Sequence, residues 1–143
     1  MTRELFAFVK ESNHIEGIYR DPTTEELDAT ASFLTLPRIE VADLCNLVSV
    51  YAPGHKLRKS PGLNVRVGKY IAPPGGPEIE EQLEMLLRGG LNAYRQHVAY
   101  ELLHPFTDGN GRSGRALWLW AMGGRAPIGF LHQFYYQTLE HAR

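Results

Sequence analysis

The segment RALWLWAMGG, residues 115–124, is apolar on every side of a helix, and it constrains the fold more than any other feature. A helix with that pattern has to be buried on most of its sides. The chain has 143 residues, 43% hydrophobic and 22% charged, which suits one compact soluble domain. We therefore expect a single domain, residues 1–143, in which this helix is buried.

Amphipathic patterns predict helices on both sides of the buried one. Leu5, Phe8 and Val9 recur at a spacing that places them on one helical face. A capping box, Thr23 followed three residues later by Glu26, indicates a helix start. With the buried helix included, the expected helices lie within residues 3–16, 21–36, 40–54, 77–87, 91–104, 115–124 and 127–143.

One stretch, residues 63–72, differs from the helical pattern. Val65, Arg66 and Val67 alternate, a Gly68-Lys69 turn follows, and Tyr70 and Ile71 continue. This pattern predicts a small β-hairpin, which has to lean on the helices because an isolated hairpin is marginal in water. The expected fold class is all-α, a bundle of about seven helices with one small β-hairpin.

The glycine-rich stretch that precedes the buried helix has the composition of an anion site. Gly109, Gly111 and Gly114 allow the backbone to turn tightly and to approach a ligand. The N-terminus of a helix attracts anions through its N–H groups and its dipole. Arg112 and Arg115, three residues apart, project toward the same region, and guanidinium groups match phosphate oxygens.

Two further side chains add chemistry to this stretch. His104 ends the preceding helix, because Pro105 disfavours helical geometry in the residue before it. Imidazole is the side chain best suited to accept a proton near neutral pH. Asp108 is positioned to hold a divalent cation that phosphates share.

Two other motifs that bind phosphate or metal ions do not match this sequence. A Walker-type loop requires Lys and Ser or Thr after its second glycine, and here Arg115 and Ala116 follow. An EF-hand loop that starts at Asp108 fails at Arg112, Ser113 and Leu119. From chemistry alone, a structural helix entrance with solvated charges remains as the alternative to a phosphate site.

The string HPFTDGNGRSGR, residues 104–115, resembles the signature of the Fic (Fic/Doc) family, H-P-F-x-D/E-G-N-G-R-x-x-R, at every fixed position. The resemblance implies a mainly helical protein adenylyltransferase, which transfers AMP from ATP to a hydroxyl side chain of a target protein. Doc-like kinases typically carry alanine and lysine where this chain has Gly109 and Gly111. AMP transfer is therefore favoured over phosphorylation.

The resemblance also implies a role for each residue of the loop. His104 would deprotonate the attacking hydroxyl, Asp108 would bind Mg²⁺ at the α- and β-phosphates, and Phe106 would anchor the loop in the core. The residues implied as nucleotide-binding are Gly109, Asn110, Gly111, Arg112 and, for the γ-phosphate, Arg115. The hairpin occupies the place of the family's flap, which pairs with the target segment by strand addition.

A second resemblance lies near the N-terminus. SNHIEG, from Ser12 to Gly17, resembles the family's inhibitory motif S/T-x-x-x-E-G/N. The implied inhibitory helix covers residues 3–17, with Glu16 paired to Arg115 and occupying the guanidinium that the γ-phosphate needs. Ser12 and Glu16 are one helical turn apart, so both can face the site. The alternative is an ordinary exposed glutamate.

Three functions follow as hypotheses. The first is an autoinhibited protein adenylyltransferase that uses ATP and Mg²⁺ on a Ser, Thr or Tyr hydroxyl. The second is removal of AMP from a modified protein, and the third is a nucleotide-responsive interaction module with vestigial catalysis. A net charge of −1 gives no reason to expect a nucleic-acid or membrane partner. A cytoplasmic location is expected. The oligomeric state is left open, and the family resemblance points to a homodimer as one option.

Overall fold

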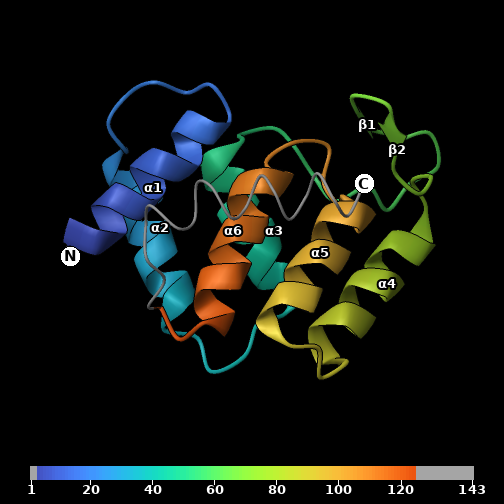
Figure 1. Cartoon of the computed structure of the whole chain (residues 1–143). Coiled ribbons are helices and arrows are strands. Elements are labelled where there is room, and N and C mark those ends of the chain that lie inside the picture. Colours follow the sequence, from blue (N-terminus) through green and yellow to red (C-terminus); the bar gives the residue numbers. More distant parts are fainter. Residues whose placement is uncertain (1–2, 125–143) are drawn as a thin grey trace.

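The computed structural model describes residues 3–124, which form six α-helices and one two-stranded antiparallel sheet (Figure 1). The elements are α1 (Arg3–Ile15), α2 (Thr24–Leu34), α3 (Val41–Tyr51), β1 (Arg66–Val67), β2 (Tyr70–Ile71), α4 (Pro77–Arg88), α5 (Ala93–Leu103) and α6 (Asn110–Ala121). The helical fold class with a small hairpin is confirmed. The seventh expected helix, 127–143, lies outside the described residues.

Helix α6 is the centre of the bundle. Helices α1, α2, α3 and α5 all pack against it, while α4 packs against α5 and α3, as Figure 1 shows. Ala116 and Leu117 have no exposed surface. The expectation of a buried helix at this position is therefore confirmed, and the helix begins at Asn110, so that it includes the second half of the glycine-rich stretch.

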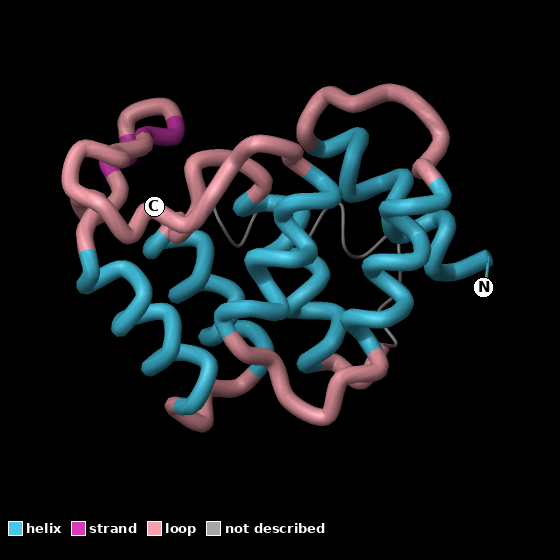
Figure 2. The backbone as a smooth tube through the Cα atoms, turned by 180° about the vertical axis from the view of Figure 1, so that it is seen from behind, coloured by secondary structure: helices cyan, strands magenta, loops and turns pink. Residues whose placement is uncertain are grey.

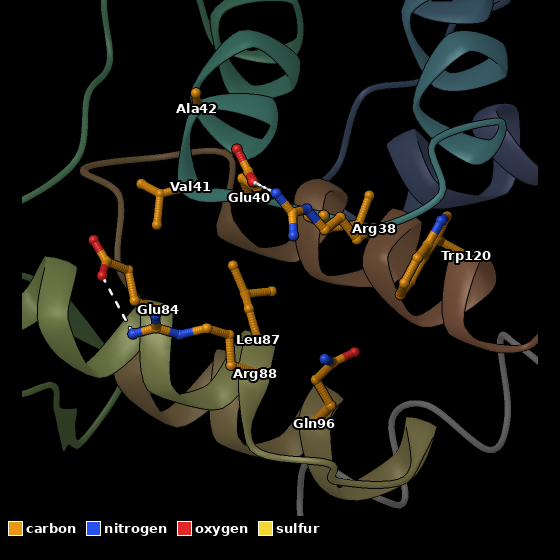
Figure 3. Close-up of a pocket in the computed structure, with 10 residues that line it drawn as sticks. Arg38, Glu40, Val41, Ala42, Glu84, Leu87, Arg88, Gln96 and Trp120 are labelled. Carbon is orange, nitrogen blue, oxygen red and sulfur yellow. Dashed lines mark ion pairs between the residues drawn. The ribbon is translucent and has the colours of Figure 1, made fainter.

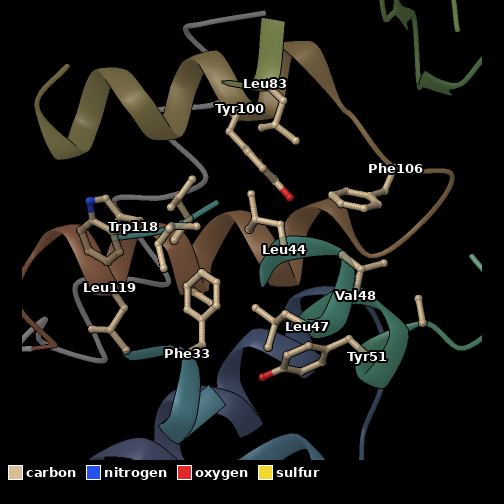
Figure 4. Packing of buried hydrophobic residues seen from close by; sticks show 14 of the residues in the cluster. Phe33, Leu44, Leu47, Val48, Tyr51, Leu83, Tyr100, Phe106, Trp118 and Leu119 are labelled. Atoms are coloured by element: carbon tan, nitrogen blue, oxygen red, sulfur yellow. The ribbon is translucent and has the colours of Figure 1, made fainter. Parts of the chain in front are cut away.

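The hydrophobic core surrounds α6 and continues between the other helices. Figure 4 shows Phe33, Leu44, Leu47 and Tyr100 converging on it from α2, α3 and α5. Trp118 of α6 is buried in the same cluster. Burying such side chains contributes roughly 1.5–3 kcal/mol each relative to leaving them exposed. The central helix is consequently a rigid support for the residues at its N-terminal end.

Local signals fix several of the helix ends as the sequence predicts. Thr23 accepts a hydrogen bond from the Glu26 N–H (3.1 Å), and the Thr23 N–H donates to Glu26 Oε1 (2.9 Å), so the capping box is complete. Pro77 occupies the first turn of α4, where its missing N–H costs nothing. Helix α5 stops at Leu103, immediately before His104 and its following proline.

The hairpin stands at one end of the bundle, beside the end of α5 and the start of α4 (Figure 2). Arg66 pairs with Ile71 and Val67 with Tyr70. Gly68 turns the chain with φ of 60°, in the left-handed region that glycine adopts without strain. The predicted hairpin and its Gly68 turn are confirmed.

Candidate functional site

The loop between α5 and α6 holds His104 in an uncommon backbone conformation. His104 has φ of 50° and is the one non-glycine residue with positive φ among residues 3–124. Its own N–H donates to Tyr100 O (2.9 Å), which closes the end of α5. A backbone of this kind persists only where the surroundings hold it in place, and it is frequent at functional sites.

Asn110 holds the loop in shape. Its Nδ2 donates to Phe106 O (2.7 Å), and its Oδ1 accepts from the Phe106 N–H (2.8 Å). Phe106 is buried in the core, as expected, with 1% of its surface exposed. Both polar atoms of the Asn110 side chain are therefore bonded within the loop. A phosphate would have to contact the backbone of Asn110.

The imidazole of His104 has a defined tautomer. Its Nδ1 lies 3.0 Å from the backbone oxygen of Glu101, and a carbonyl can only accept, so Nδ1 carries the proton. In the neutral ring, Nε2 is then the proton-accepting nitrogen. The arrangement suits a general base oriented by the end of α5.

Glu16 places a carboxylate at the N-terminal end of α6. A Cβ added at Gly111 would collide with Glu16 Oε2, and it would lie 3.1 Å from Arg115 Nη1. Glu16 Oε2 accepts a hydrogen bond from Arg115 Nη2 at 2.6 Å. The space above Gly111 thus accommodates an anionic oxygen, as expected for a helix N-terminus.

Arg115 is a fully buried side chain that contacts the end of the N-terminal helix. Its Nε donates to Ser12 Oγ (2.8 Å), and its Nη2 donates to Ser12 O (3.0 Å) as well as to Glu16. Arg115 has no exposed surface, whereas the Glu16 side chain is 38% exposed. Gly17 follows with φ of 79° and turns the chain away from α1. Ser12 and Glu16 therefore face the site, as the sequence predicted.

A second contact set, missed by the sequence analysis, holds the end of α1 against α2. The buried Glu26 accepts from Arg20 at 2.9 and 3.1 Å and from Asn13 Nδ2 at 3.3 Å. Burial raises the pKa of Glu26, but hydrogen bonds from Arg20, the Thr23 N–H and Asn13 lower it, and the net pKa lies below its usual value. Only the capping role of Glu26 was readable from the sequence.

Arg112 faces α3. Its Nη1 donates to Tyr51 O (2.9 Å), and its guanidinium carbon lies 5.6 Å from the centre of the Tyr51 ring. Its Nε is buried and has no hydrogen-bond partner among the described residues. Arg112 and Arg115 therefore have different partners, and the Arg112 Nε is a donor suited to an anion.

Asp108 is the exposed carboxylate of the loop. Its Oδ1 accepts from the Gly109 N–H (2.8 Å), and its Oδ2 lies 3.8 Å from His55 Nε2. No cluster of three or more His, Cys, Asp or Glu side chains forms a metal site within residues 3–124. Mg²⁺ commonly binds through one or two carboxylates plus substrate phosphates and water, so the donors at this loop fit Mg²⁺ brought with a nucleotide.

Gly109 and Gly114 have steric reasons to be glycine. Gly109 precedes α6 with φ of 80°, and a Cβ there would lie 3.2 Å from Ala52 Cβ. At Gly114, a Cβ would collide with Glu101 Oε1 and lie 3.0 Å from the Tyr100 ring. The glycine-rich pattern predicts ligand approach at Gly114, but in the structure the missing side chain allows the close packing of α5 on α6.

Replacing Gly114 by alanine should lower the free energy of unfolding by about 1–2 kcal/mol. Forcing a methyl group into a packed interior typically costs about 1–3 kcal/mol, and alanine's better helix propensity returns up to about 1 kcal/mol. Urea denaturation followed by circular dichroism measures the difference. An unchanged or raised midpoint would show that Tyr100 and Glu101 yield without cost.

His97 also joins α5 to α6, and it does so as a neutral imidazole. Its Nδ1–H donates to Gly114 O (3.0 Å), and 4% of the residue is exposed. Burial lowers the pKa of His97 to about 4, with a smaller lowering from the charge of Arg115, against a raising effect of the bond to Gly114. The folded protein thus binds a proton at His97 less readily than the unfolded chain.

The free energy of unfolding should decline by about 3 kcal/mol as the pH falls from 6.5 to about 4, because of His97. The folded pKa lies below the unfolded value of 6.5, so this stability is complete above pH 6.5 and lost toward pH 4. Urea titrations across this range should show a shallower dependence for His97→Gln. His55→Gln, at a side chain 43% exposed, is the matched control. Equal slopes for His97→Gln and the wild type would contradict the assignment.

A separate pocket of about 380 Å³ lies at the other end of α6, between α3, α4 and α5 (Figure 3). Trp120, Leu87 and Gln96 are among its lining residues. Its charged residues pair with one another, Arg38 with Glu40 at 2.9 Å and Arg88 with Glu84 at 3.5 Å. Ten residue steps of α6, about 15 Å, separate Trp120 from Asn110 at the N-terminal end of the helix, so the pocket is distinct from the glycine-rich loop.

The fold and the loop together define a helical domain in which the Glu16 carboxylate lies at the start of the central helix. A family model, described as the Fic/DOC family, matches residues 3–122. The chain therefore belongs to the Fic/DOC family, which indicates a group-transfer enzyme of the nucleotidyl-transferring kind. The comparison with curated proteins gave no match. None of the helices within residues 3–124 is long and apolar enough to cross a membrane.

Proposed function

We propose that this protein is an autoinhibited protein adenylyltransferase, which transfers AMP from ATP to a hydroxyl side chain of a target protein. The observation that carries the proposal is the position of the Glu16 carboxylate, which lies over Gly111 and on Arg115. An anionic oxygen of the chain itself occupies the place where the family signature implies phosphate. Membership of the Fic/DOC family supplies the reaction class.

In the proposed reaction, His104 acts as the general base. The target hydroxyl gives its proton to His104 Nε2 while its oxygen bonds to the α-phosphorus of ATP. The bond between the α-phosphorus and the oxygen bridging to the β-phosphorus breaks, and pyrophosphate leaves. The Nδ1–H bond to Glu101 O, 3.0 Å long, keeps the ring in the required tautomer.

The start of α6 and its arginines would bind the phosphates. Gly111 would leave room for a phosphate oxygen near the helix N–H groups once Glu16 has left, and the unpartnered Nε of Arg112 offers a further donor. Arg115 would contact the γ-phosphate once Glu16 has left. Asp108 would hold Mg²⁺, which neutralises phosphate charge when bound.

Inhibition would follow from competition between two anions for one guanidinium. Glu16 and the terminal phosphate both require Arg115 Nη2, which donates to Glu16 at 2.6 Å. The contacts among Asn13, Arg20 and Glu26 keep the end of α1 in this inhibitory position. Activation would require α1 to release Arg115.

Intact-mass analysis of Glu16→Gly incubated with Mg²⁺ and each nucleoside triphosphate tests the proposal, because self-modification identifies the transferred group without a known target. We expect a mass increase of one adenylyl group with ATP, and none after His104→Ala is added. A phosphoryl increment would instead indicate a kinase. Tight ATP binding without any transfer would favour an interaction module, and incubation with an adenylylated protein would reveal the reverse reaction.

A further inference from the structure

Arg58 and Arg115 are the two largest fully buried side chains among the described residues, and neither has any exposed surface. The Arg58 side chain lies away from Glu16 and the start of α6 and contacts the hairpin segment and the end of α5. Its guanidinium donates to four backbone carbonyls: those of His104 (2.6 Å), Leu103 (2.8 Å), Pro73 (2.7 Å) and Leu63 (3.1 Å). No carboxylate forms an ion pair with it within residues 3–124. Burial lowers the pKa of Arg58, but a guanidinium stays charged in proteins. A buried positive charge whose hydrogen-bond acceptors are all backbone carbonyls requires an explanation.

Two of these carbonyls belong to the C-terminal end of α5. The last carbonyls of a helix lack partners within the helix, and a positive charge there is favourable. Four successive backbone carbonyls, from Leu102 to Pro105, accept hydrogen bonds from Arg58 or from Tyr70 of the hairpin. Tyr70 Oη donates to Leu102 O (2.5 Å), the Arg58 side chain donates to Leu103 O and His104 O, and the Arg58 N–H donates to Pro105 O (2.8 Å).

The other two carbonyls bracket the hairpin. Leu63 precedes β1 and Pro73 follows β2, so one guanidinium nitrogen, Nη1, holds both ends of the segment 63–73. The Gly76 N–H donates to Arg58 O (2.9 Å), which attaches the chain after the hairpin to the same residue. Arg58 thus joins the hairpin, at both ends, to the carbonyl end of α5.

Apolar packing contributes little to the position of the hairpin. Of residues 63–73, only Ala72 is buried. A groove of about 490 Å³ lies between the hairpin, α4 and α5, with Tyr70 in its wall. Strands of two residues each are unstable without outside support. The hydrogen bonds of Arg58 and Tyr70 therefore hold the hairpin in place.

We propose that Arg58 and Tyr70 are positioning residues, which fix the hairpin against the carbonyl end of α5 and so set where a hydroxyl held by the hairpin lies relative to His104. The role in catalysis rests on the proposed function and on the hairpin acting as the flap that the family resemblance implies, which pairs with the target segment. Displacing a reactant by about 1 Å can cost 100-fold in rate. The Arg58 Nε also donates to the backbone oxygen of His104. Loss of the anchor therefore moves both the hairpin, which holds the hydroxyl, and the general base.

Two substitutions distinguish the loss of the anchoring hydrogen bonds from a general loss of stability. Tyr70→Phe keeps the ring and removes only the hydroxyl that binds Leu102 O. Arg58→Lys keeps the charge, but a single nitrogen cannot reach four carbonyls in two segments. Tyr94→Phe, at a residue 46% exposed, and Arg88→Lys, at a side chain 74% exposed, are the matched controls. All four are made in wild type and in Glu16→Gly.

Amide hydrogen exchange, followed by mass spectrometry on the full chain, measures how firmly the hairpin is held and requires no enzymatic activity. Exchange in peptides covering 63–73 should rise about tenfold in Tyr70→Phe, as expected for the loss of one hydrogen bond, and more in Arg58→Lys. Exchange in α1 and α2 should not change, which excludes general unfolding. Unchanged exchange at 63–73 in both variants would overturn the anchor.

The partition of ATP between self-adenylylation and hydrolysis, measured in Glu16→Gly, reports the positioning role. Water needs no hairpin, so Tyr70→Phe should lower transfer to protein hydroxyls at least fivefold relative to hydrolysis, with an unchanged KM for ATP. Raised exchange with an unchanged partition would overturn the positioning role. If Glu16→Gly alone shows no transfer, the proposed function fails, and the exchange result still decides the anchor.

Discussion

Replacing Glu16 by glycine should raise the rate of AMP transfer from ATP about 10- to 100-fold. The 2.6 Å hydrogen bond from Arg115 to Glu16 joins two charged groups, and such a bond contributes about 1.5–3 kcal/mol. In the proposed function, ATP has to break this bond before its γ-phosphate can reach Arg115. Removing the carboxylate removes that cost, and initial rates of self-modification with α-labelled ATP measure the gain.

Asp21→Gly is the matched control for this experiment. It removes a carboxylate from the segment after α1, where Asp21 pairs with Lys10 at 3.2 Å and the side chain is 72% exposed. It should leave the rate unchanged. Glu16→Gln, which keeps the size and loses the charge, should give an intermediate rate. Equal rates for Glu16→Gly and the wild type would show that the pair does not restrain the enzyme.

Replacing His104 by alanine in the Glu16→Gly protein should reduce transfer about 100- to 10,000-fold, the usual contribution of a general base. Binding of ATP should change little, because the phosphates are assigned to the start of α6. Rates and nucleotide affinity are measured on the same preparation, so that loss of folding is distinguished from loss of chemistry.

His104→Asn is the control for backbone geometry. Asparagine tolerates the left-handed conformation that His104 adopts, with φ of 50°, better than most residues. It cannot act as a base, so it should be as inactive as the alanine variant. Activity in His104→Asn would contradict the assignment of the imidazole as the proton acceptor.

Features set by neighbouring residues could be predicted from the sequence. The capping box of Thr23 and Glu26, the end of α5 before Pro105 and the hairpin turn at Gly68 depend on local backbone preferences. The burial of α6 follows from a run of apolar side chains. The pairing of Glu16 with Arg115, 99 residues apart, was predictable only because both belong to recognisable motifs.

Contacts between distant residues outside any motif were not predictable. Arg112 belongs to the signature, but the bond from its Nη1 to Tyr51 O, 61 residues away, follows from no motif. Arg58 lies in the charged stretch KLRK, residues 56–59. It is nevertheless fully buried, and its partners at the end of α5 are 45 and 46 residues away. A buried arginine is recognised only once the carbonyls that satisfy it are known.

If Glu16 and the terminal phosphates compete for Arg115, removing Glu16 has to change the affinity for nucleotides that carry those phosphates. Isothermal titration calorimetry with Mg²⁺ compares ATP and AMP on His104→Ala and on His104→Ala with Glu16→Gly, where no turnover intervenes. We expect Glu16→Gly to lower the Kd for ATP about 10- to 100-fold and to leave the Kd for AMP nearly unchanged. An equal gain for AMP, or no gain for ATP, would contradict this competition.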